Sequence, residues 1–213
     1  MKTKMTMLSL TLVLLLSAVS YAGFGIGADV YSRYVWRGTD FGNSASVQPA
    51  LSYSVGGFEV GAWASYPITS DVTSLGANEN DLYLSYAIGD FGITITDYYF
   101  PEGGDVFNYS SDDGIHFLEG SLSYSLVPVS LLAGYFFSGD SDNSMYAEVG
   151  YGFYESDDIS ASLTVGAGNG MYVLEDDFNV VNVGLTISSG SMSVSYIINP
   201  DSETNFLVFG YSL

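Results

Sequence analysis

Apolar side chains occupy every second position in stretches of about ten residues from Gly23 to Leu213. At the end of the chain, for example, Leu207, Phe209 and Tyr211 alternate with Val208 and Gly210. Successive side chains of a β-strand point to opposite faces, so this period of two predicts strands with one apolar face. Either a protein core or lipid can cover such a face, and the choice between them decides the class of function.

The start of the chain predicts a signal peptide. Lys2 and Lys4 are followed by an apolar run over Met7–Leu16, and the small residues Ser20 and Ala22 stand at the positions that a signal peptidase reads. The apolar run is shorter than the ~20 residues that a membrane-spanning helix needs. We therefore expect residues 1–22 to be removed and residues 23–213 to form one domain.

Composition excludes several classes of protein. After the leader only two basic residues, Arg33 and Arg37, stand against all 24 acidic ones, so we expect no binding of nucleic acid, which requires basic surfaces. The chain has no Cys, which excludes an acylated N-terminus, disulfides and thiolate metal sites. It has 18 Tyr, a residue that favours the boundary between membrane and water.

The connections between the predicted strands alternate in length. We predict twelve strands, at residues 24–37, 44–55, 58–66, 79–88, 91–100, 115–125, 129–137, 144–154, 159–167, 178–188, 191–198 and 204–213. Tight turns, most of them rich in Gly, Asp or Pro, are predicted at residues 56–57, 89–90, 126–128, 155–158 and 189–190. Longer, mostly acidic loops are predicted at residues 38–43, 67–78, 101–114, 138–143, 168–177 and 199–203. An even strand count with short turns on one rim and long loops on the other is typical of barrels in the bacterial outer membrane.

The composition of the two strand faces favours lipid over a protein core. One face carries side chains such as Leu51, Leu84 and Leu122, whereas the other carries Ser52, Ser85 and Ser123. A core of serines would be poorly packed and poorly satisfied, which argues against a soluble sandwich or lipocalin-like barrel. The expected fold is therefore all-β: a single antiparallel, up-and-down transmembrane β-barrel of twelve strands after a cleaved signal peptide. It would lie in the cell outer membrane with both termini in the periplasm.

Two residues do not fit the alternation. Asp97 falls on the same face as Ile93 and Ile95, so either a bulge shifts the register or Asp97 has reached the outer rim. Pro49 lies inside a predicted strand, where its missing N–H interrupts the hydrogen-bond ladder. We expect a bulge near one of these two positions.

A short motif near the mature start resembles a known family. The run Ser32–Gly38 reads Ser-Arg-Tyr-Val-Trp-Arg-Gly and is similar to the Ser-x-Tyr-Val-aromatic-Arg-Gly signature of the TorF-type porin family, also called Gcw_chp. Further similar segments follow in the family's order at Pro49–Leu51, Gly61–Ser65, Tyr98–Gly103 and Glu119. The chain differs at Arg33, where the family often has Asp, and in a more Ser-rich second half. The resemblance implies a barrel with a channel role and brings no established substrate or catalytic residue.

Because side chains alternate between the two faces of a strand, the odd or even position of a residue (its parity) decides whether it faces lipid or the lumen. On this basis the polar residues of the strands face the lumen. The candidate lumen or selectivity residues are Asp29, Tyr31, Arg33, Arg37, Glu59, Trp63, Asp81, Glu119 and Glu148. Two cations opposite five carboxylates suggest clusters that give a pore a transverse field and ion selectivity. The alternative is that Arg33 and Arg37 form buried ion pairs that only satisfy charge and fix strand register.

These residues predict a narrow, somewhat cation-preferring outer-membrane channel for ions or small polar solutes. Twelve strands lie between a barrel filled by side chains and a wide aqueous channel. One alternative is a non-conducting structural or adhesive barrel with acidic surface loops. The other is a lipid-modifying enzyme, which needs a nucleophile and a base; no motif ties the lone His116 to a nucleophile, so we expect no enzyme and no catalytic residue.

We expect no cofactor and no dedicated metal site. Asp112, Asp113, Asp176 and Asp177 offer hard oxygen ligands in the loops, but they lack the spacing of a calcium loop. The expected partners are the lipid bilayer with its outer-leaflet lipid, small solutes or ions, and the outer-membrane assembly machinery, which reads a C-terminal signature similar to Phe209, Tyr211 and Leu213. Neither the solute nor the oligomeric state follows from the sequence.

Overall fold

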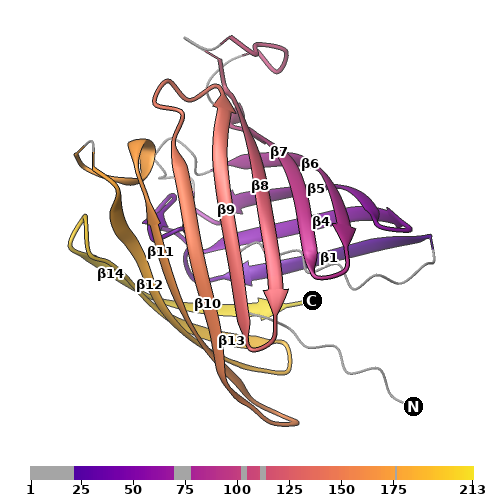
Figure 1. Ribbon diagram of the computed structural model, residues 1–213, viewed down its shortest axis with the longest axis vertical. Helices are drawn as coiled ribbons and strands as arrows, with labels where there is room; N and C mark the ends of the chain where they lie inside the picture. The colour runs from indigo at the N-terminus through magenta and orange to yellow at the C-terminus, as the bar shows by residue number, and fades with distance from the viewer. Residues whose placement is uncertain (1–21, 70–77, 102–104, 111–113, 176) are drawn as a thin grey trace.

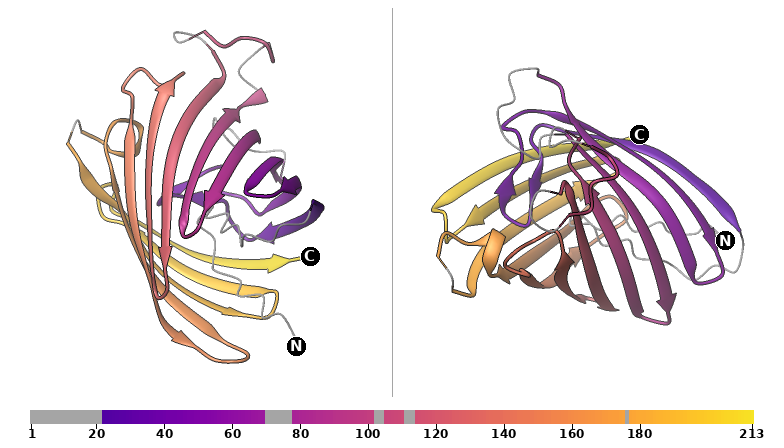
Figure 2. Two further views of the ribbon diagram at one scale, coloured as in Figure 1. Left: turned by 45° about the vertical axis from the view of Figure 1, so that its right-hand side comes forward. Right: turned by 90° about the horizontal axis from the view of Figure 1, so that it is seen from above.

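Twelve antiparallel strands close into a single barrel in the computed structural model (Figure 1). The structure describes residues 22–69, 78–101, 105–110, 114–175 and 177–213. Each barrel strand pairs with the strands nearest to it in sequence, and β1 closes the ring against β14 (Figure 2). The predicted all-β, up-and-down barrel of twelve strands is therefore confirmed. The predicted signal peptide lies almost wholly outside the described residues.

The barrel strands are eight to eleven residues long. They are β1 (Gly23–Tyr31), β4 (Ser46–Val55), β5 (Phe58–Pro67), β6 (Glu79–Ile88), β7 (Phe91–Tyr99), β8 (His116–Leu126), β9 (Val129–Ser138), β10 (Met145–Glu155), β11 (Ser160–Gly168), β12 (Asn179–Ser189), β13 (Met192–Asn199) and β14 (Thr204–Ser212). Besides the strands of the barrel wall, the described residues form a two-stranded sheet of β2 (Val35–Trp36) and β3 (Thr39–Asp40) and a 3₁₀ turn, η2 (Gly170–Tyr172). In the part of the chain that the structure describes, no helix is long and apolar enough to cross a membrane.

Side-chain burial follows the alternation of the sequence. In β6, for example, Leu82 and Leu84 are exposed, whereas Asp81, Tyr83 and Ser85 are buried. A closed sheet has only an outside and an inside, so the apolar set faces outwards and the polar set faces the lumen. This arrangement is the reverse of a soluble barrel, which buries its apolar set.

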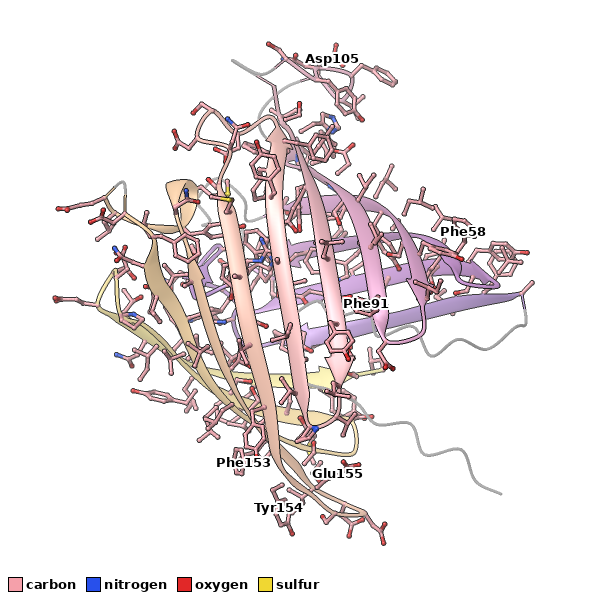
Figure 3. The ribbon with its side chains drawn as sticks, viewed as in Figure 1. Phe58, Phe91, Asp105, Phe153, Tyr154 and Glu155 are labelled. Atoms are coloured by element: carbon pink, nitrogen blue, oxygen red, sulfur yellow. The ribbon has the colours of Figure 1, made fainter. Side chains whose placement is uncertain are left out.

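The two rims of the barrel differ in the length of their connections. One rim, here called the short-turn rim, carries the β4–β5, β6–β7, β8–β9, β10–β11 and β12–β13 turns; the other is the long-loop rim. Figure 3 shows Phe153, Tyr154 and Glu155 at one end of the barrel and Asp105 at the other. Because the strand count is even, β1 starts and β14 ends at the short-turn rim.

The first predicted strand is too long. β1 ends at Tyr31 instead of residue 37, and the connection to β4 covers residues 32–45 instead of 38–43. Within this connection β2 and β3 form a hairpin, called the inner hairpin below (residues 33–41). The alternation continues through β2, so the sequence pattern alone does not reveal where the chain leaves the wall.

Neither exceptional residue produces a bulge in its own strand. At Pro49 the β4–β5 ladder is interrupted between Val47 and Ala50, but the register on both sides is the same. β7 also keeps one register, so Asp97 stays on the outer face, close to the long-loop rim. The strands of Pro49 and Asp97 therefore carry no bulge themselves, but a register shift in the neighbouring β8–β9 pair lies at Leu118, the partner of Asp97. The described register shifts lie in the β8–β9, β10–β11 and β11–β12 pairs.

The joint between the first and last strands is short. β1 pairs with β4 over Gly23–Tyr31, but with β14 only over Asp29–Tyr31. Two further backbone hydrogen bonds extend it, from Ser32 to Phe209 and from Leu213 to Ala28.

A cross-link tests whether this joint closes the ring. We expect the double variant Asp29→Cys/Ser212→Cys to oxidise readily, because these residues are directly opposite and adjacent antiparallel strands bring Cβ atoms within disulfide reach. The cross-linked chain would run faster than the reduced one on a denaturing gel. The matched pair Asp29→Cys/Ser195→Cys should stay reduced, since Ser195 lies on β13; equal oxidation of both pairs would contradict the closed register.

Candidate functional site

The inner hairpin turns at Arg37 and Gly38. Val35 pairs with Asp40 and Trp36 with Thr39, which leaves a two-residue turn. Both turn residues have positive φ, 49° at Arg37 and 83° at Gly38, as in the type I′ turns that suit β-hairpins. Asn is the usual first residue of such a turn, and a longer side chain there carries strain of order 1 kcal/mol or more. The contacts of the Arg37 guanidinium offset this strain.

Gly38 lies against the opposite wall of the barrel. A Cβ atom at this position would lie 1.9 Å from the backbone oxygen of Val181 on β12. On its other side the Gly38 carbonyl oxygen accepts a hydrogen bond of 3.3 Å from the Asn199 side chain on β13. Only glycine satisfies both the turn and this close approach, which gives the Arg-Gly pair of the motif a physical reason.

Arg37 makes a buried ion pair with Glu119 of β8. Both guanidinium NH₂ groups donate to the two carboxylate oxygens, and the side chains are only 4% and 2% exposed. This bidentate geometry is the strong form of an arginine–carboxylate pair. The Glu119 carboxylate lies over Gly134 of the neighbouring strand β9. A side chain at that position would collide with it, since a Cβ at Gly134 would lie 2.8 Å from the carboxylate. The prediction that Arg37 faces a carboxylate inside the barrel is confirmed.

Aromatic rings surround the Arg37 guanidinium. It lies 4.4 Å from the ring centre of Trp36 and 4.5 Å from that of Tyr146, and it donates a hydrogen bond to the Tyr172 hydroxyl. Tyr146 and Tyr172 belong to a buried cluster with Tyr98, Phe136 and Val181. Cation–π contacts strengthen when they are desolvated, so this cluster both packs and stabilises the charge. It forms a layer near the long-loop rim.

The other side of the inner hairpin rests on β5 and β6. The Tyr34 hydroxyl donates a hydrogen bond of 2.9 Å to Glu79, and its ring lies 5.6 Å from that of Trp63. Arg37 contacts the opposite part of the wall. The inner hairpin therefore crosses the lumen from β5 and β6 to β8, β12 and β13.

Most candidate residues lie where parity placed them. Glu59, Asp81, Glu119 and Glu148 are buried inside the barrel, and Tyr31 is buried over Gly210. Trp63 and Asp29 are half-buried on the same inner face. Glu59 accepts hydrogen bonds from Ser54 and Tyr83, and Glu148 accepts them from Tyr146 and Asn182.

The two arginines lie on a different element from the one predicted. Parity assigned Arg33 and Arg37 to a wall strand, but both belong to the inner hairpin. Arg33 pairs with Asp40 of the same hairpin and is about one-third exposed, so it holds the hairpin together and does not face a carboxylate across the lumen. Arg37 alone therefore faces a carboxylate of the wall, an arrangement that fits both an opposed charge cluster of a pore and a buried ion pair that only satisfies charge.

Several residues of the site were not predicted. Glu79 lies two positions before Asp81 on the same strand face, so parity could have identified it. Tyr34 lies within the Ser32–Gly38 motif, but the alternation places it in the apolar set of the first predicted strand and not in the lumen. Tyr172 and Asn199 lie in or next to loops, where no periodic signal exists. Their roles depend on which loops fold inwards, and that follows only from the tertiary structure.

The described residues line a hollow in the lumen and another on the outer wall. A cavity of about 310 Å³ lies inside the barrel near the β1–β14 joint, between Asp29, Tyr31 and Gln48 and the β12–β13 turn. A larger cleft of about 890 Å³ lies on the outer wall, over Leu51, Ala62 and Leu82 and below loop residues Phe107 and Tyr109. The larger hollow is therefore not part of the lumen.

A polar cluster borders the outer cleft. His116 is hydrogen-bonded through Nδ1 to Asp97, at 2.8 Å, and through Nε2 to the backbone oxygen of Val106, at 2.9 Å. The Tyr109 hydroxyl donates to the second oxygen of Asp97, which raises the pKa of Tyr109, with smaller contributions from partial burial and the Asp97 charge. Both ring nitrogens of His116 face oxygen atoms of the protein, and the ring donates to both only when it is protonated.

The metal candidates of the loops do not form a described site. Asp177 is exposed, and Asp112, Asp113 and Asp176 lie outside the described residues. Among the residues that the structure describes, no group of three or more His, Asp or Glu side chains is arranged to hold a metal ion.

Comparison with known proteins identifies a family. A family model described as a bacterial protein of unknown function (Gcw_chp) matches residues 17–210. The chain therefore belongs to this family. A comparison with the curated proteins found none that matches the chain. The family match covers all of the barrel except the last two residues of β14 and includes the inner hairpin, but its description carries no activity.

A double-mutant cycle tests the buried pair. We expect Arg37→Met and Glu119→Met each to lower the free energy of unfolding by about 3–5 kcal/mol, because each leaves the other charge buried and unpaired. The double variant should cost less than the sum of the two. Urea titration in detergent, followed by Trp fluorescence, measures these values.

The half-exposed pair of Arg33 and Asp40 supplies the control. We expect Arg33→Met to cost no more than about 1 kcal/mol. Additive effects of Arg37→Met and Glu119→Met would show that the two side chains do not act as a pair.

Proposed function

We propose that this Gcw_chp family member is an outer-membrane barrel that acts as a narrow, cation-preferring channel for ions or small polar solutes. The inner hairpin is its constriction, and both termini lie in the periplasm. The observation that carries the proposal is the inverted distribution of side chains, with an apolar outside and a polar, acidic inside. The TorF-type porin resemblance of the Ser32–Gly38 motif agrees with this role.

The outer face of the barrel supports a lipid environment. Large apolar side chains are exposed on the barrel strands, up to 82% at Phe24 and 89% at Ile26. Near the short-turn rim the outer face carries paired rings, with centres 4.5–4.8 Å apart: Phe24 with Tyr53, Phe58 with Tyr86, and Phe91 with Tyr124. Girdles of aromatic residues at the interface are a mark of transmembrane barrels.

The charges of the lumen support a preference for cations. Within the described residues, five carboxylates are buried inside the barrel, at Glu59, Glu79, Asp81, Glu119 and Glu148. Arg37 is the one buried cation there, and its charge is balanced by Glu119. A negative lumen with low-dielectric walls attracts cations and repels anions.

The packed layer around Arg37 favours the second candidate, a non-conducting structural or adhesive barrel. Tyr98, Phe136, Tyr146, Tyr172 and Val181 are each at most 6% exposed. If this layer stays packed, any solute has to pass beside the inner hairpin or displace it. We propose no enzymatic role, and the engagement of both His116 nitrogens supports this.

A matched pair of substitutions tests which face meets lipid. Leu122 and Ser123 are neighbours in the middle of β8, and Leu122 is 60% exposed on the outer face. We expect Leu122→Arg to lower the free energy of unfolding in phospholipid vesicles by about 2–4 kcal/mol, the cost of a charge on the lipid face. Ser123→Arg should cost less, since its charge enters the acidic lumen. A larger loss for Ser123→Arg would place the apolar face away from lipid.

Conductance of single barrels tests the channel. Because Tyr31 and Ser46 are opposite in register, a two-residue Asn-Gly turn can replace residues 32–45 without moving β1 or β4. We expect small conductance steps for the intact protein in planar bilayers and steps several-fold larger for the variant, because the replacement removes the constriction. Reversal potentials in a salt gradient should favour cations in both.

The two proteins together separate the candidate functions. If conductance steps occur only in the variant that lacks residues 32–45, the inner hairpin seals the intact barrel, which supports the structural or adhesive role. The absence of steps in both, with folded protein verified in the bilayer, would exclude a channel. Circular dichroism and resistance to unfolding on cold denaturing gels verify the fold.

A further inference from the structure

Two carboxylates inside the barrel lack the donors that the other buried acids have. Glu119 binds Arg37, while Glu59 and Glu148 each accept hydrogen bonds from two side chains. Glu79 accepts one, from Tyr34, and otherwise lies within hydrogen-bond reach of Asp81. Asp81 Oδ1 is buried without a hydrogen-bond partner. Both residues are 3% exposed, so bulk solvent does not reach them.

A buried hydroxyl on the neighbouring strand is also without a partner. Ser65 is directly opposite Glu79 in the β5–β6 register and is 0% exposed, and its Oγ atom makes no hydrogen bond. Opposite residues on adjacent antiparallel strands have Cβ atoms about 5 Å apart. The Ser65 hydroxyl therefore lies beside the two carboxylates on the same inner face. Unsatisfied polar atoms are rare in protein interiors, and two of them, Ser65 Oγ and Asp81 Oδ1, adjoin Glu79 here.

No basic side chain of the described residues neutralises this group. Arg37 is engaged by Glu119 and Arg33 by Asp40. Two adjacent carboxylates in a low-dielectric interior repel each other strongly unless a cation or a proton lies between them. Carboxylate and hydroxyl oxygens are hard ligands of the kind that Ca²⁺ binds.

We propose that Ser65, Glu79 and Asp81 bind a hard divalent cation between β5 and β6, beneath Tyr34 of the inner hairpin. Two carboxylates balance the charge of one such ion, and water completes its coordination. Because Tyr34 is hydrogen-bonded to Glu79, the bound ion also holds the inner hairpin against this wall. The site does not depend on conduction, since a barrel that passes no ions still binds one here.

Terbium luminescence tests the site, with Tb³⁺ as the probe of a calcium-type site. Trp63 is opposite Asp81 in register and Tyr34 contacts Glu79, so light absorbed by these rings should sensitise a bound ion. We expect saturable Tb³⁺ emission from the full mature protein in detergent, and loss of this emission when Ca²⁺ is added in excess. Asp81→Asn and Glu79→Gln should each weaken binding by about tenfold or more, because each removes a charged ligand.

Controls separate this site from the acidic loops and from other buried acids. Asp177→Asn removes an exposed loop carboxylate, and Glu59→Gln removes a buried carboxylate that has two hydrogen-bond donors. We expect both to leave the affinity of the sensitised site unchanged.

Thermal unfolding gives a second readout that does not require emission. Ca²⁺ should raise the unfolding temperature of the wild type and of Asp177→Asn, but not that of Asp81→Asn, because only a ligand of the folded state stabilises it. The proposal is overturned if the wild type shows no saturable emission, or if Asp81→Asn and Glu79→Gln bind as tightly as the wild type. Either result would leave a proton shared between the two carboxyl groups as the explanation of the pair.

Discussion

The closed ring of hydrogen bonds between neighbouring strands is the constraint on which the rest of the structure depends. Once the ring closes, every side chain of a strand faces either outwards or inwards, and neither face can exchange residues with the other. The apolar residues occupy the outside, so every polar group inside has to find its partner within the lumen. The hydrogen-bonded carboxylates Glu59 and Glu148 and the Arg37–Glu119 pair are the result.

The inner hairpin shows how one motif meets this demand. Its turn places Arg37 opposite Glu119, and its glycine lies against β12 and β13. The strained backbone at Arg37 is therefore tied to the strongest charge pair of the interior. Residues 33–41 continue the strand pattern of the wall in sequence but lie inside the barrel in space, and the proposed constriction is built from them.

The fold could be predicted from the sequence because period-two alternation and turn length are local signals. Twelve strands, their order and the faces of Asp81, Glu119 and Glu148 follow from them. The path of residues 32–45 could not be predicted, because alternation in β2 continues that of β1 although the chain has left the wall. The strands of Pro49 and Asp97 keep their own register because each accommodates the exception locally, by a gap in the ladder at Pro49 and by the His116 and Tyr109 contacts of Asp97. The nearest register shift lies one strand away, at Leu118 opposite Asp97.

The short joint between β1 and β14 has a consequence for how the barrel assembles. These two strands are the most distant in sequence, so the entropic cost of bringing them together is the largest of any neighbouring pair. The hydrogen-bond ladder that offsets this cost spans only Asp29–Tyr31. We therefore expect hairpins between consecutive strands to form before the ring closes, with Ser32 and Leu213 completing the ladder at its two ends. We also expect a folded barrel to open sideways most easily at this joint, because it has the fewest paired residues of any neighbouring barrel strands.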